Sequence, residues 1–225
     1  MAAFLGSGAL THRIHPCAGL LASLARLITG ANTRWIDCPA EPRQRLYFAN
    51  HTSHLDFVAL WAALPEPIRN RTRPVAAREY WERNRVRSYL ATNVFQSVLV
   101  ARPEPAAGES NGFGLTGGRN ILSPLFDELE KGSSLILFPE GTRGNGEEVG
   151  EFKAGLYHLC RSNPEIEAVP VYLENLNRIL PKGEFLPLPL LSRVTFGPPI
   201  RPAVDEGKSE FLQRARRALC RLKDL

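Results

Sequence analysis

Short apolar or β-branched runs alternate with segments of helical periodicity along most of the chain, and this alternation constrains the fold most strongly. The runs predict strands at residues 45–49, 75–77, 98–100, 134–138, 168–171 and 194–196. Between them, residues 55–64 and 121–129 have the spacing of helices, and the second helix is predicted to end at Gly132. Strands separated by helices are typical of parallel pairing. The sequence therefore predicts an α/β fold: a single domain with a mostly parallel, mixed sheet flanked by helices.

The composition agrees with one globular domain that has a full core. The chain has 225 residues, of which 44% are hydrophobic and 23% charged, with no internal repeat and no shift in composition that would divide it. The formal net charge of +5 favours an anionic partner. That partner could be nucleic acid, a phosphorylated substrate or an acidic membrane surface, and the charge alone does not choose among them.

The four cysteines are scattered and form no Cys-x-x-Cys pair, which favours a reducing, cytoplasmic setting. No run approaches the roughly 18 apolar residues that a membrane-spanning helix requires. The best candidate, residues 17–28, is interrupted by Ser23 and Arg26, which also makes it a poor signal peptide. We therefore expect a protein that does not span a membrane.

Residues 1–30 are predicted to be an amphipathic, membrane-associating helical segment, and residues 31–225 the main domain. One face of the helix carries Leu20, Leu21, Leu24, Leu27 and Ile28, with Ala22 and Arg26 opposite. The leucine face could pack on the core or lie in a membrane interface. Residues 102–118 are rich in Gly, Pro, Ser and Glu, and we expect a mobile loop there.

The segment Asn-His-Thr-Ser-His-Leu-Asp at residues 50–56 follows the first of these strands directly. Ser53 and Asp56 have the spacing of a capping box, so we expect a helix to begin at Ser53. His51 then lies on the turn at the carboxyl end of a strand, where open α/β sheets bind their ligands. The Asp56 carboxylate can fix one imidazole nitrogen and leave the other as a base.

Two alternatives for this segment stay open on the residues alone. Asp56 could simply cap the helix, with His51 an ordinary turn residue. His51, His54 and Asp56 could also bind a metal ion in a hydrolase, although the chain has only three other histidines to complete such a site.

The second segment, Phe-Pro-Glu-Gly-Thr-Arg at residues 138–143, also lies at the end of a predicted strand. Backbone N–H groups of a glycine-containing turn, together with the Arg143 guanidinium, suit a phosphate. Arg102 and Lys153 are further cations that could join this site. A solvated, charged turn is the alternative. The chain has no nucleotide-binding glycine motif and no Gly-x-Ser-x-Gly, which removes support for nucleotide hydrolysis, dinucleotide binding and a serine hydrolase.

Together and in this order, the two segments resemble the glycerolipid acyltransferases, a family that includes the 1-acyl-glycerol-3-phosphate (lysophosphatidate) acyltransferases. The first family motif is matched by Asn50, His51, Ser53 and Asp56, the third by residues 138–143, and the fourth by Val169, Pro170 and Val171. The second motif is met only loosely by residues 98–102, which keep its arginine, Arg102.

The resemblance implies acyl transfer from a thioester to the free hydroxyl of a lysophospholipid, giving phosphatidate. His51 would be the general base and Asp56 would orient it, without an acyl-enzyme. The implied acceptor-binding residues are Arg102, Glu140, Gly141, Thr142 and Arg143, with Asn50, Ser53 and Lys153 in support. No bound cofactor or metal is implied. The co-substrate would be acyl-CoA or acyl carrier protein loaded with an acyl chain.

A lipid acceptor implies peripheral attachment to the inner face of a membrane, on the cytoplasmic side. An anionic surface suits the arginine-rich stretch formed by Arg69, Arg71, Arg73, Arg78, Arg83, Arg85 and Arg87. The basic, amphipathic segment from Lys208 onward predicts a helix that either packs on the core or contacts the membrane. No known nucleic-acid-binding module accompanies these charges. A non-enzymatic lipid-binding module with the same fold, and an acyltransferase for another lysolipid, are the alternative functions.

Overall fold

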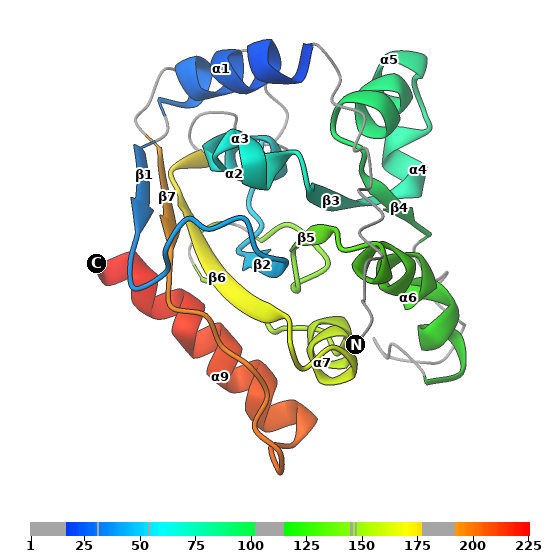
Figure 1. Ribbon diagram of the computed structural model, residues 1–225, viewed down its shortest axis with the longest axis vertical. Coiled ribbons are helices and arrows are strands. Elements are labelled where there is room, and N and C mark those ends of the chain that lie inside the picture. The colour runs from blue at the N-terminus through cyan, green and yellow to red at the C-terminus, as the bar shows by residue number, and fades with distance from the viewer. Residues whose placement is uncertain are drawn as a thin grey trace, which may run out of the picture.

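A seven-stranded sheet forms the centre of the molecule, with helices on both of its faces (Figure 1). The computed structural model describes residues 17–30, 32–53, 55–101, 115–144, 146, 148–176 and 192–225. The strands are β1 (Asn32–Trp35), β2 (Arg45–Ala49), β3 (Thr72–Ala77), β4 (Val98–Val100), β5 (Ser134–Leu137), β6 (Glu167–Glu174) and β7 (Arg193–Phe196). Their order across the sheet is β1-β7-β6-β2-β5-β3-β4.

The helices connect these strands and cover the sheet. They are α1 (Cys17–Thr29), α2 (Asp56–Ala63), α3 (Glu66–Arg69), α4 (Arg78–Trp81), α5 (Arg85–Tyr89), the π-helix η1 (Leu90–Val94), α6 (Leu115–Glu130), α7 (Gly155–Ser162), α9 (Lys208–Arg221) and the 3₁₀-helix η2 (Leu222–Asp224). In the part of the chain listed above, no helix is long and apolar enough to cross a membrane.

Strand β2 lies at the centre of the sheet, parallel to β5 on one side and to β6 on the other. Strands β3 and β4 continue the parallel arrangement beyond β5, and only the β6–β7 pair is antiparallel. The predicted α/β fold with a mostly parallel, mixed sheet is confirmed. Because parallel strands point the same way, the segments that follow β2 and β5 emerge at the same edge of the sheet.

Successive residues of β2 enter two different apolar layers. Tyr47 and Ala49 belong to a cluster that includes α1 and α2, whereas Leu46 and Phe48 belong to one that includes α6, α7 and α9. All residues of β2 and β5 are buried, as expected for central strands covered on both faces. The central strands therefore hold the segments at their ends on a rigid, packed support.

Several element boundaries differ from the predictions, including the starts of two helices. Helix α2 begins at Asp56 rather than at Ser53, because the Asp56 carboxylate binds backbone amides of the preceding turn and keeps that turn out of the helix. Helix α6 begins at Leu115, so the last four residues of the predicted loop 102–118 are helical. Residues 102–114 lie outside the described part of the chain, and their mobility stays a prediction.

Helix α1 lies within the predicted segment 1–30, and residues 1–16 of that segment lie outside the described part of the chain. Alanines rather than most of the leucines form its contact with the core. Ala18, Ala22 and Ala25 are buried, whereas Leu20 and Leu27 are 74% and 80% exposed. The small alanines allow close approach to α2. Arg26 reinforces the contact, because its guanidinium donates to the carbonyls of Ala62 and Leu64. Leu20, Leu24 and Leu27 therefore point away from the core, whereas Leu21 packs against it.

Helix α9 shows the opposite outcome, since Phe211, Ala215 and Leu219 on its apolar face are fully buried. The core-packed interpretation of this basic helix is confirmed. The predicted arginine-rich surface needs a correction, because Arg69 and Arg73 are buried. Each folds back onto backbone carbonyls, Arg69 onto Leu64 and Arg73 onto Asn70.

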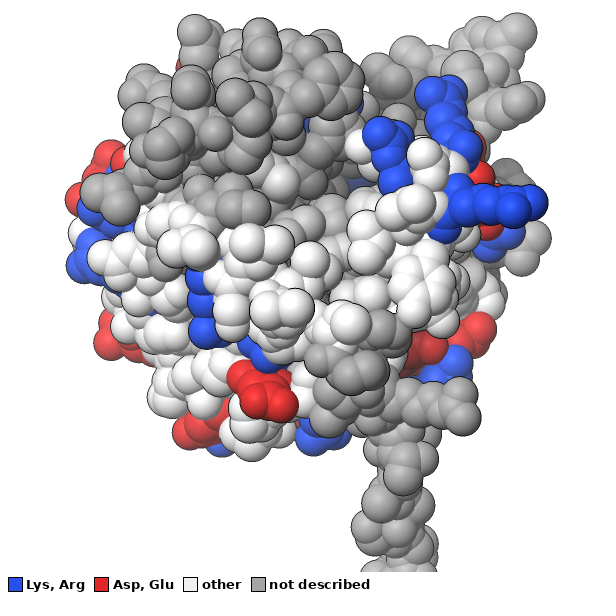
Figure 2. Space-filling view, turned by 90° about the horizontal axis from the view of Figure 1, so that it is seen from above, with Lys and Arg blue, Asp and Glu red and all other residues white. Residues whose placement is uncertain are grey.

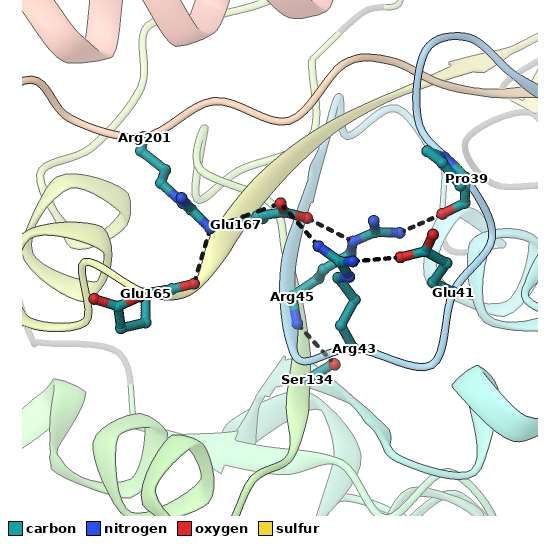
Figure 3. Close-up of polar contacts among 8 residues, drawn as sticks. All are labelled: Pro39, Glu41, Arg43, Arg45, Ser134, Glu165, Glu167 and Arg201. Carbon is teal, nitrogen blue, oxygen red and sulfur yellow. Dashed lines mark hydrogen bonds and ion pairs between the residues drawn. The ribbon is translucent and has the colours of Figure 1, made fainter.

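At the amino ends of β2 and β6, Glu167 joins three arginines (Figure 3). Its carboxylate lies 3.1 Å from Arg45 Nε, 3.7 Å from Arg43 Nη1 and 3.6 Å from Arg201 Nη2. The buried Arg45 also donates to the Pro39 carbonyl, and its backbone N–H donates to Ser134 Oγ. This group fastens β2 to β5 and β6 at the edge of the sheet opposite the functional segments.

We predict that Glu167→Gln lowers the free energy of unfolding by about 1–3 kcal/mol, because the buried Arg45 loses its counter-charge. Urea denaturation measures the change. Glu41→Gln is the control, since the half-buried Glu41 pairs with the exposed Arg43, and we expect it to cost at most about 0.5 kcal/mol. Equal losses in the two variants would contradict this role of Glu167.

Candidate active site

The turn after β2 begins with Asn50, whose side chain fixes it to the neighbouring strand. Asn50 Nδ2 donates to the Leu173 carbonyl at 2.9 Å, and its Oδ1 accepts the Leu173 N–H at 2.8 Å. Both groups are buried, so these bonds form away from water. Asn50, predicted as a supporting residue, thus ties the start of the His51 segment to β6.

His51 and Asp56 are in direct contact. His51 Nδ1 lies 2.9 Å from Asp56 Oδ2, and the same oxygen accepts the backbone N–H groups of Thr52 at 2.5 Å and Ser53 at 2.8 Å. Asp56 is fully buried, whereas the His51 side chain is 23% exposed. With a carboxylate at Nδ1, that nitrogen carries the proton and Nε2 keeps a free lone pair. The predicted orienting role of Asp56 therefore has a geometric basis.

The His51 ring also stacks on Phe138, with 4.4 Å between the ring centroids and 26° between the planes. Phe138 follows β5, so the stacking depends on β2 and β5 being neighbours. From the sequence, Phe138 was assigned no role in the site beyond ending a strand and beginning the 138–143 segment. Its place in that segment, next to Pro139, was the one feature that could have indicated a contact with His51. Stacking and the Asp56 contact together restrict the imidazole to one orientation.

Glu140 faces the backbone of the His51 turn. Its Oε1 accepts the His51 N–H at 2.8 Å, and its Oε2 accepts the Gly150 N–H at 2.8 Å. The residue is only 7% exposed. Both carboxylate oxygens are therefore engaged by backbone amides, a geometry that favours a supporting role over the acceptor contact implied by the resemblance.

The turn after Glu140 requires a glycine. Gly141 has φ of +70°, and a Cβ there would lie 2.9 Å from Lys153 Cε. The Lys153 side chain thus crosses the turn, and its backbone N–H donates to the Pro139 carbonyl. This contact places the predicted supporting lysine next to the 138–143 segment.

Thr142 and Arg143 follow on the exposed side of the turn. Within the described part of the chain, the Arg143 guanidinium makes no hydrogen bond or ion pair, so its donors face solvent. The structure thus brings His51, Asp56, Glu140, Gly141 and Lys153 into one contiguous group with this arginine. Arg102 and His54 lie outside the described residues, and the role of Arg102 stays a prediction.

Three of the four cysteines, Cys38, Cys160 and Cys220, lack the properties of nucleophiles. Burial raises the pKa of the Cys160 thiol to about 12 and also raises the pKa values of Cys38 and Cys220. A thiol with a raised pKa carries little thiolate near neutral pH and reacts slowly. Among the described residues, which exclude His54, no three His, Cys, Asp or Glu side chains are grouped so as to hold a metal ion.

An oriented imidazole beside an exposed arginine is suited to remove a proton from a hydroxyl near an anionic group. The sequence also matches the family described as Acyltransferase over residues 39–174, and the chain belongs to this family.

The relatives are longer than this chain. It is 29% identical over 160 residues to the 1-acyl-sn-glycerol-3-phosphate acyltransferase of Limnanthes alba, covering 70% of this chain and 50% of the relative. It is 33% identical over 64 residues to a chloroplastic 1-acyl-sn-glycerol-3-phosphate acyltransferase of Arabidopsis thaliana, covering 28% and 18% of the two chains. The chain thus spans about half the length of the first relative, and less of the second.

The fold has a counterpart among solved structures. The 1-acyl-sn-glycerophosphate (LPA) acyltransferase PlsC of Thermotoga maritima superposes with a TM-score of 0.68 at 16% identity, covering 92% of this chain and 77% of that one. At this identity the match shows a shared fold.

We predict that Asp56 holds His51 in the Nδ1–H tautomer, and that Asp56→Asn abolishes this preference because an amide does not provide the negative charge. Imidazole ¹⁵N shifts measured by NMR distinguish the tautomers, and His51→Ala assigns the signal. Asp205→Asn, at an exposed position remote in sequence, is the matched control and should leave the tautomer unchanged. An unaltered His51 spectrum in Asp56→Asn would contradict the geometry.

Proposed function

We propose that the protein transfers a fatty acyl group from an acyl thioester to the free hydroxyl of 1-acyl-glycerol-3-phosphate, giving phosphatidate. The observation that carries this proposal is the His51–Asp56 pair, with Nδ1 held at 2.9 Å and Nε2 left as a base. Family membership supports acyl transfer as the reaction class. The names of the relatives support the acceptor, since they are 1-acyl-sn-glycerol-3-phosphate acyltransferases.

In this reaction His51 Nε2 accepts the proton of the acceptor hydroxyl as its oxygen attacks the thioester carbonyl carbon. The tetrahedral intermediate collapses, the C–S bond breaks, and the thiolate takes the proton from the imidazolium. The Asp56 carboxylate stabilises that imidazolium. General-base help of this kind typically contributes about 10²- to 10⁴-fold to the rate. No side chain becomes acylated, which agrees with the raised pKa values of the buried thiols.

The acceptor phosphate would bind Arg143, because a guanidinium offers two parallel N–H groups to a phosphate. Lys153, whose side chain crosses Gly141, adds a second cation beside the same turn. Thr142 lies next to Arg143, and Arg102 would join the group through the second family motif. The acyl donor would be acyl-CoA or acyl carrier protein carrying the chain.

The test is a panel of lysolipids offered to purified protein with each type of thioester, following thiol release and the lipid product. We expect phosphatidate from lysophosphatidate. A preference for a lysolipid without a terminal phosphate would overturn the proposed acceptor, and no product from any pair would overturn the reaction.

We predict that His51→Ala lowers kcat by about 10²- to 10⁴-fold or more while the protein stays folded, because the general base is removed. Steady-state kinetics and circular dichroism measure the two effects. His158→Ala is the matched control: this histidine lies on α7, away from the His51 turn, and should leave kcat within about twofold. Retained turnover in folded His51→Ala would contradict the mechanism.

We further propose that α1 attaches the protein peripherally to the membrane that supplies the acceptor. Leu20, Leu24 and Leu27 form an apolar stripe on α1, with 74%, 47% and 80% of their surfaces exposed. Figure 2 views this end of the molecule, where the centre of the described surface is largely uncharged. Basic side chains form a group at the upper right, and basic and acidic side chains are mixed along the left and lower margins. A surface of this kind is typical of helices that lie in a membrane interface.

The basic group supports an anionic lipid surface as the partner. Arg78, Arg83 and Arg85 on and beside α4 and α5 are exposed, and Val86 and Tyr89 of α5 are 66% and 52% exposed among them. Lysine or arginine near an anionic bilayer contributes roughly 1 kcal/mol per charge. Because anionic lipids are concentrated in the cytoplasmic leaflet, attachment to the inner face is the arrangement we propose. Helix α9 lies at the other end of the view in Figure 1 and is not part of this contact.

We predict that Leu27→Ser weakens binding to anionic phosphatidylglycerol vesicles by about tenfold or more, since burying a leucine is worth about 1.5–3 kcal/mol. Vesicle flotation measures the binding. Val204→Ser is the matched control, because Val204 is equally exposed, at 79%, in the turn before α9. Equal losses in the two variants, or none in Leu27→Ser, would contradict attachment through α1.

A further inference from the structure

The segment from Glu140 to Gly144 binds both backbone polar groups of His51, its N–H and its carbonyl. The Glu140 carboxylate accepts the His51 N–H at 2.8 Å, and the Gly144 N–H donates to the His51 carbonyl at 2.8 Å. Arg143 lies between these two contacts in the sequence. The residue that carries the base and the loop that carries the exposed arginine are therefore joined into one hydrogen-bonded unit.

This loop is fastened in turn to the C-terminal helix. Arg216 of α9 donates to the Val149 carbonyl from Nε at 2.9 Å and from Nη2 at 2.5 Å, and its Nε also lies 3.1 Å from the Gly150 carbonyl. The N–H of Gly150 then donates to Glu140. Since α9 is anchored by its buried apolar face, a continuous chain of contacts runs from the core through Arg216, Gly150 and Glu140 to His51.

We propose that Glu140 and Arg216 are positioning residues that set the distance between the His51 base and the Arg143 phosphate-binding loop. The inference rests on the proposed function, because it concerns one acceptor whose hydroxyl and phosphate are held at the same time. Proton transfer requires the hydroxyl within about 2.6–3.2 Å of Nε2. A misplacement of about 1 Å can cost on the order of 10²-fold in rate.

The geometry distinguishes this role from direct contact with the acceptor. Both oxygens of Glu140 are bound by backbone amides, and the side chain is 7% exposed. Arg216 donates to the backbone carbonyls of Val149 and Gly150, nine and ten residues along the chain from Glu140. Because both oxygens of Glu140 are occupied, a change at Glu140 reaches the acceptor by moving the loops that its carboxylate joins.

Three variants disturb this chain of contacts in different ways. Glu140→Gln keeps the shape but replaces one accepting oxygen by an NH₂ group, so one of the two amide bonds is lost. Gly150→Ala adds a Cβ that would lie 2.9 Å from Glu140 Oε2, which displaces the carboxylate without removing a charge. Arg216→Ala frees the 149–150 backbone from α9. The matched controls are Glu151→Gln and Arg217→Ala, both at exposed neighbouring positions.

The first readout is kinetic, with lysophosphatidate as acceptor. We expect Glu140→Gln to lower kcat about tenfold to a hundredfold, and Gly150→Ala and Arg216→Ala about threefold to tenfold, with KM changed by less than about threefold. Thermal denaturation gives the folded fraction. A loss of kcat that is fully explained by unfolded protein, or equal losses in Glu151→Gln and Arg217→Ala, would overturn the inference.

The second kinetic readout is the dependence on Arg143. If Glu140 sets the distance between base and phosphate, its loss matters less once the phosphate is no longer held. Glu140→Gln in an Arg143→Ala background should therefore cost less than in the wild-type protein, giving a non-additive cycle. Strictly multiplicative effects would overturn the inference.

The third readout needs no substrate and separates this inference from the proposed function. Hydrogen exchange of the His51 amide, followed by NMR, should be about tenfold faster or more in Glu140→Gln and Arg216→Ala, and unchanged in Arg217→Ala. Unchanged exchange in Arg216→Ala would overturn the connection from α9 to His51. If the wild-type protein showed no acyl transfer, the proposed function would be overturned. Hydrogen exchange of the His51 amide would still test the chain of contacts from α9 to His51.

Discussion

The contact between the Asp56 carboxylate and the turn that precedes it organises the rest of the site. One buried oxygen accepts His51 Nδ1 and the N–H groups of Thr52 and Ser53, so a single side chain fixes the turn, the start of α2 and the orientation of the imidazole. Deep burial of a carboxylate is costly unless donors satisfy it. The backbone provides two donors to Asp56 Oδ2, whereas Oδ1 is buried without a hydrogen-bond partner among the described residues. The base is thus a product of local backbone geometry.

The sheet adds contacts to His51 from residues that are distant in the sequence. Because β2 and β5 are parallel neighbours, two residues that follow β5 contact His51. The Phe138 ring stacks on the imidazole, and the Glu140 carboxylate accepts the His51 N–H from 89 residues away in the sequence. The same segment continues into Gly141 and Arg143. The proposed base at one strand end and the proposed phosphate-binding turn at the next therefore lie next to each other, and Arg216 of α9 holds the backbone that follows the second segment.

The sequence predicted what depends on local spacing and missed what depends on packing. Buried strands were found because both of their faces are apolar, whereas β1, with the polar sequence of residues 32–35, was not. The His51–Asp56 contact spans five residues and followed from spacing. The Glu140 contact with the His51 N–H depends on which strands pair, so spacing did not reveal it, and the acceptor role implied by the resemblance stays a prediction. The exposed face of α1 was ambiguous in the sequence, because small alanines can pack as well as leucines.

The central claim is direct transfer, in which His51 activates the acceptor hydroxyl and no protein group is acylated. Rapid-quench measurement of thiol release tests it most directly, with purified protein mixed with an acyl thioester before lysophosphatidate is added. The account predicts no burst of thiol without the acceptor, and then one thiol released for each phosphatidate formed. A burst equal to the enzyme concentration before the acceptor is added would show an acyl-enzyme and contradict the account.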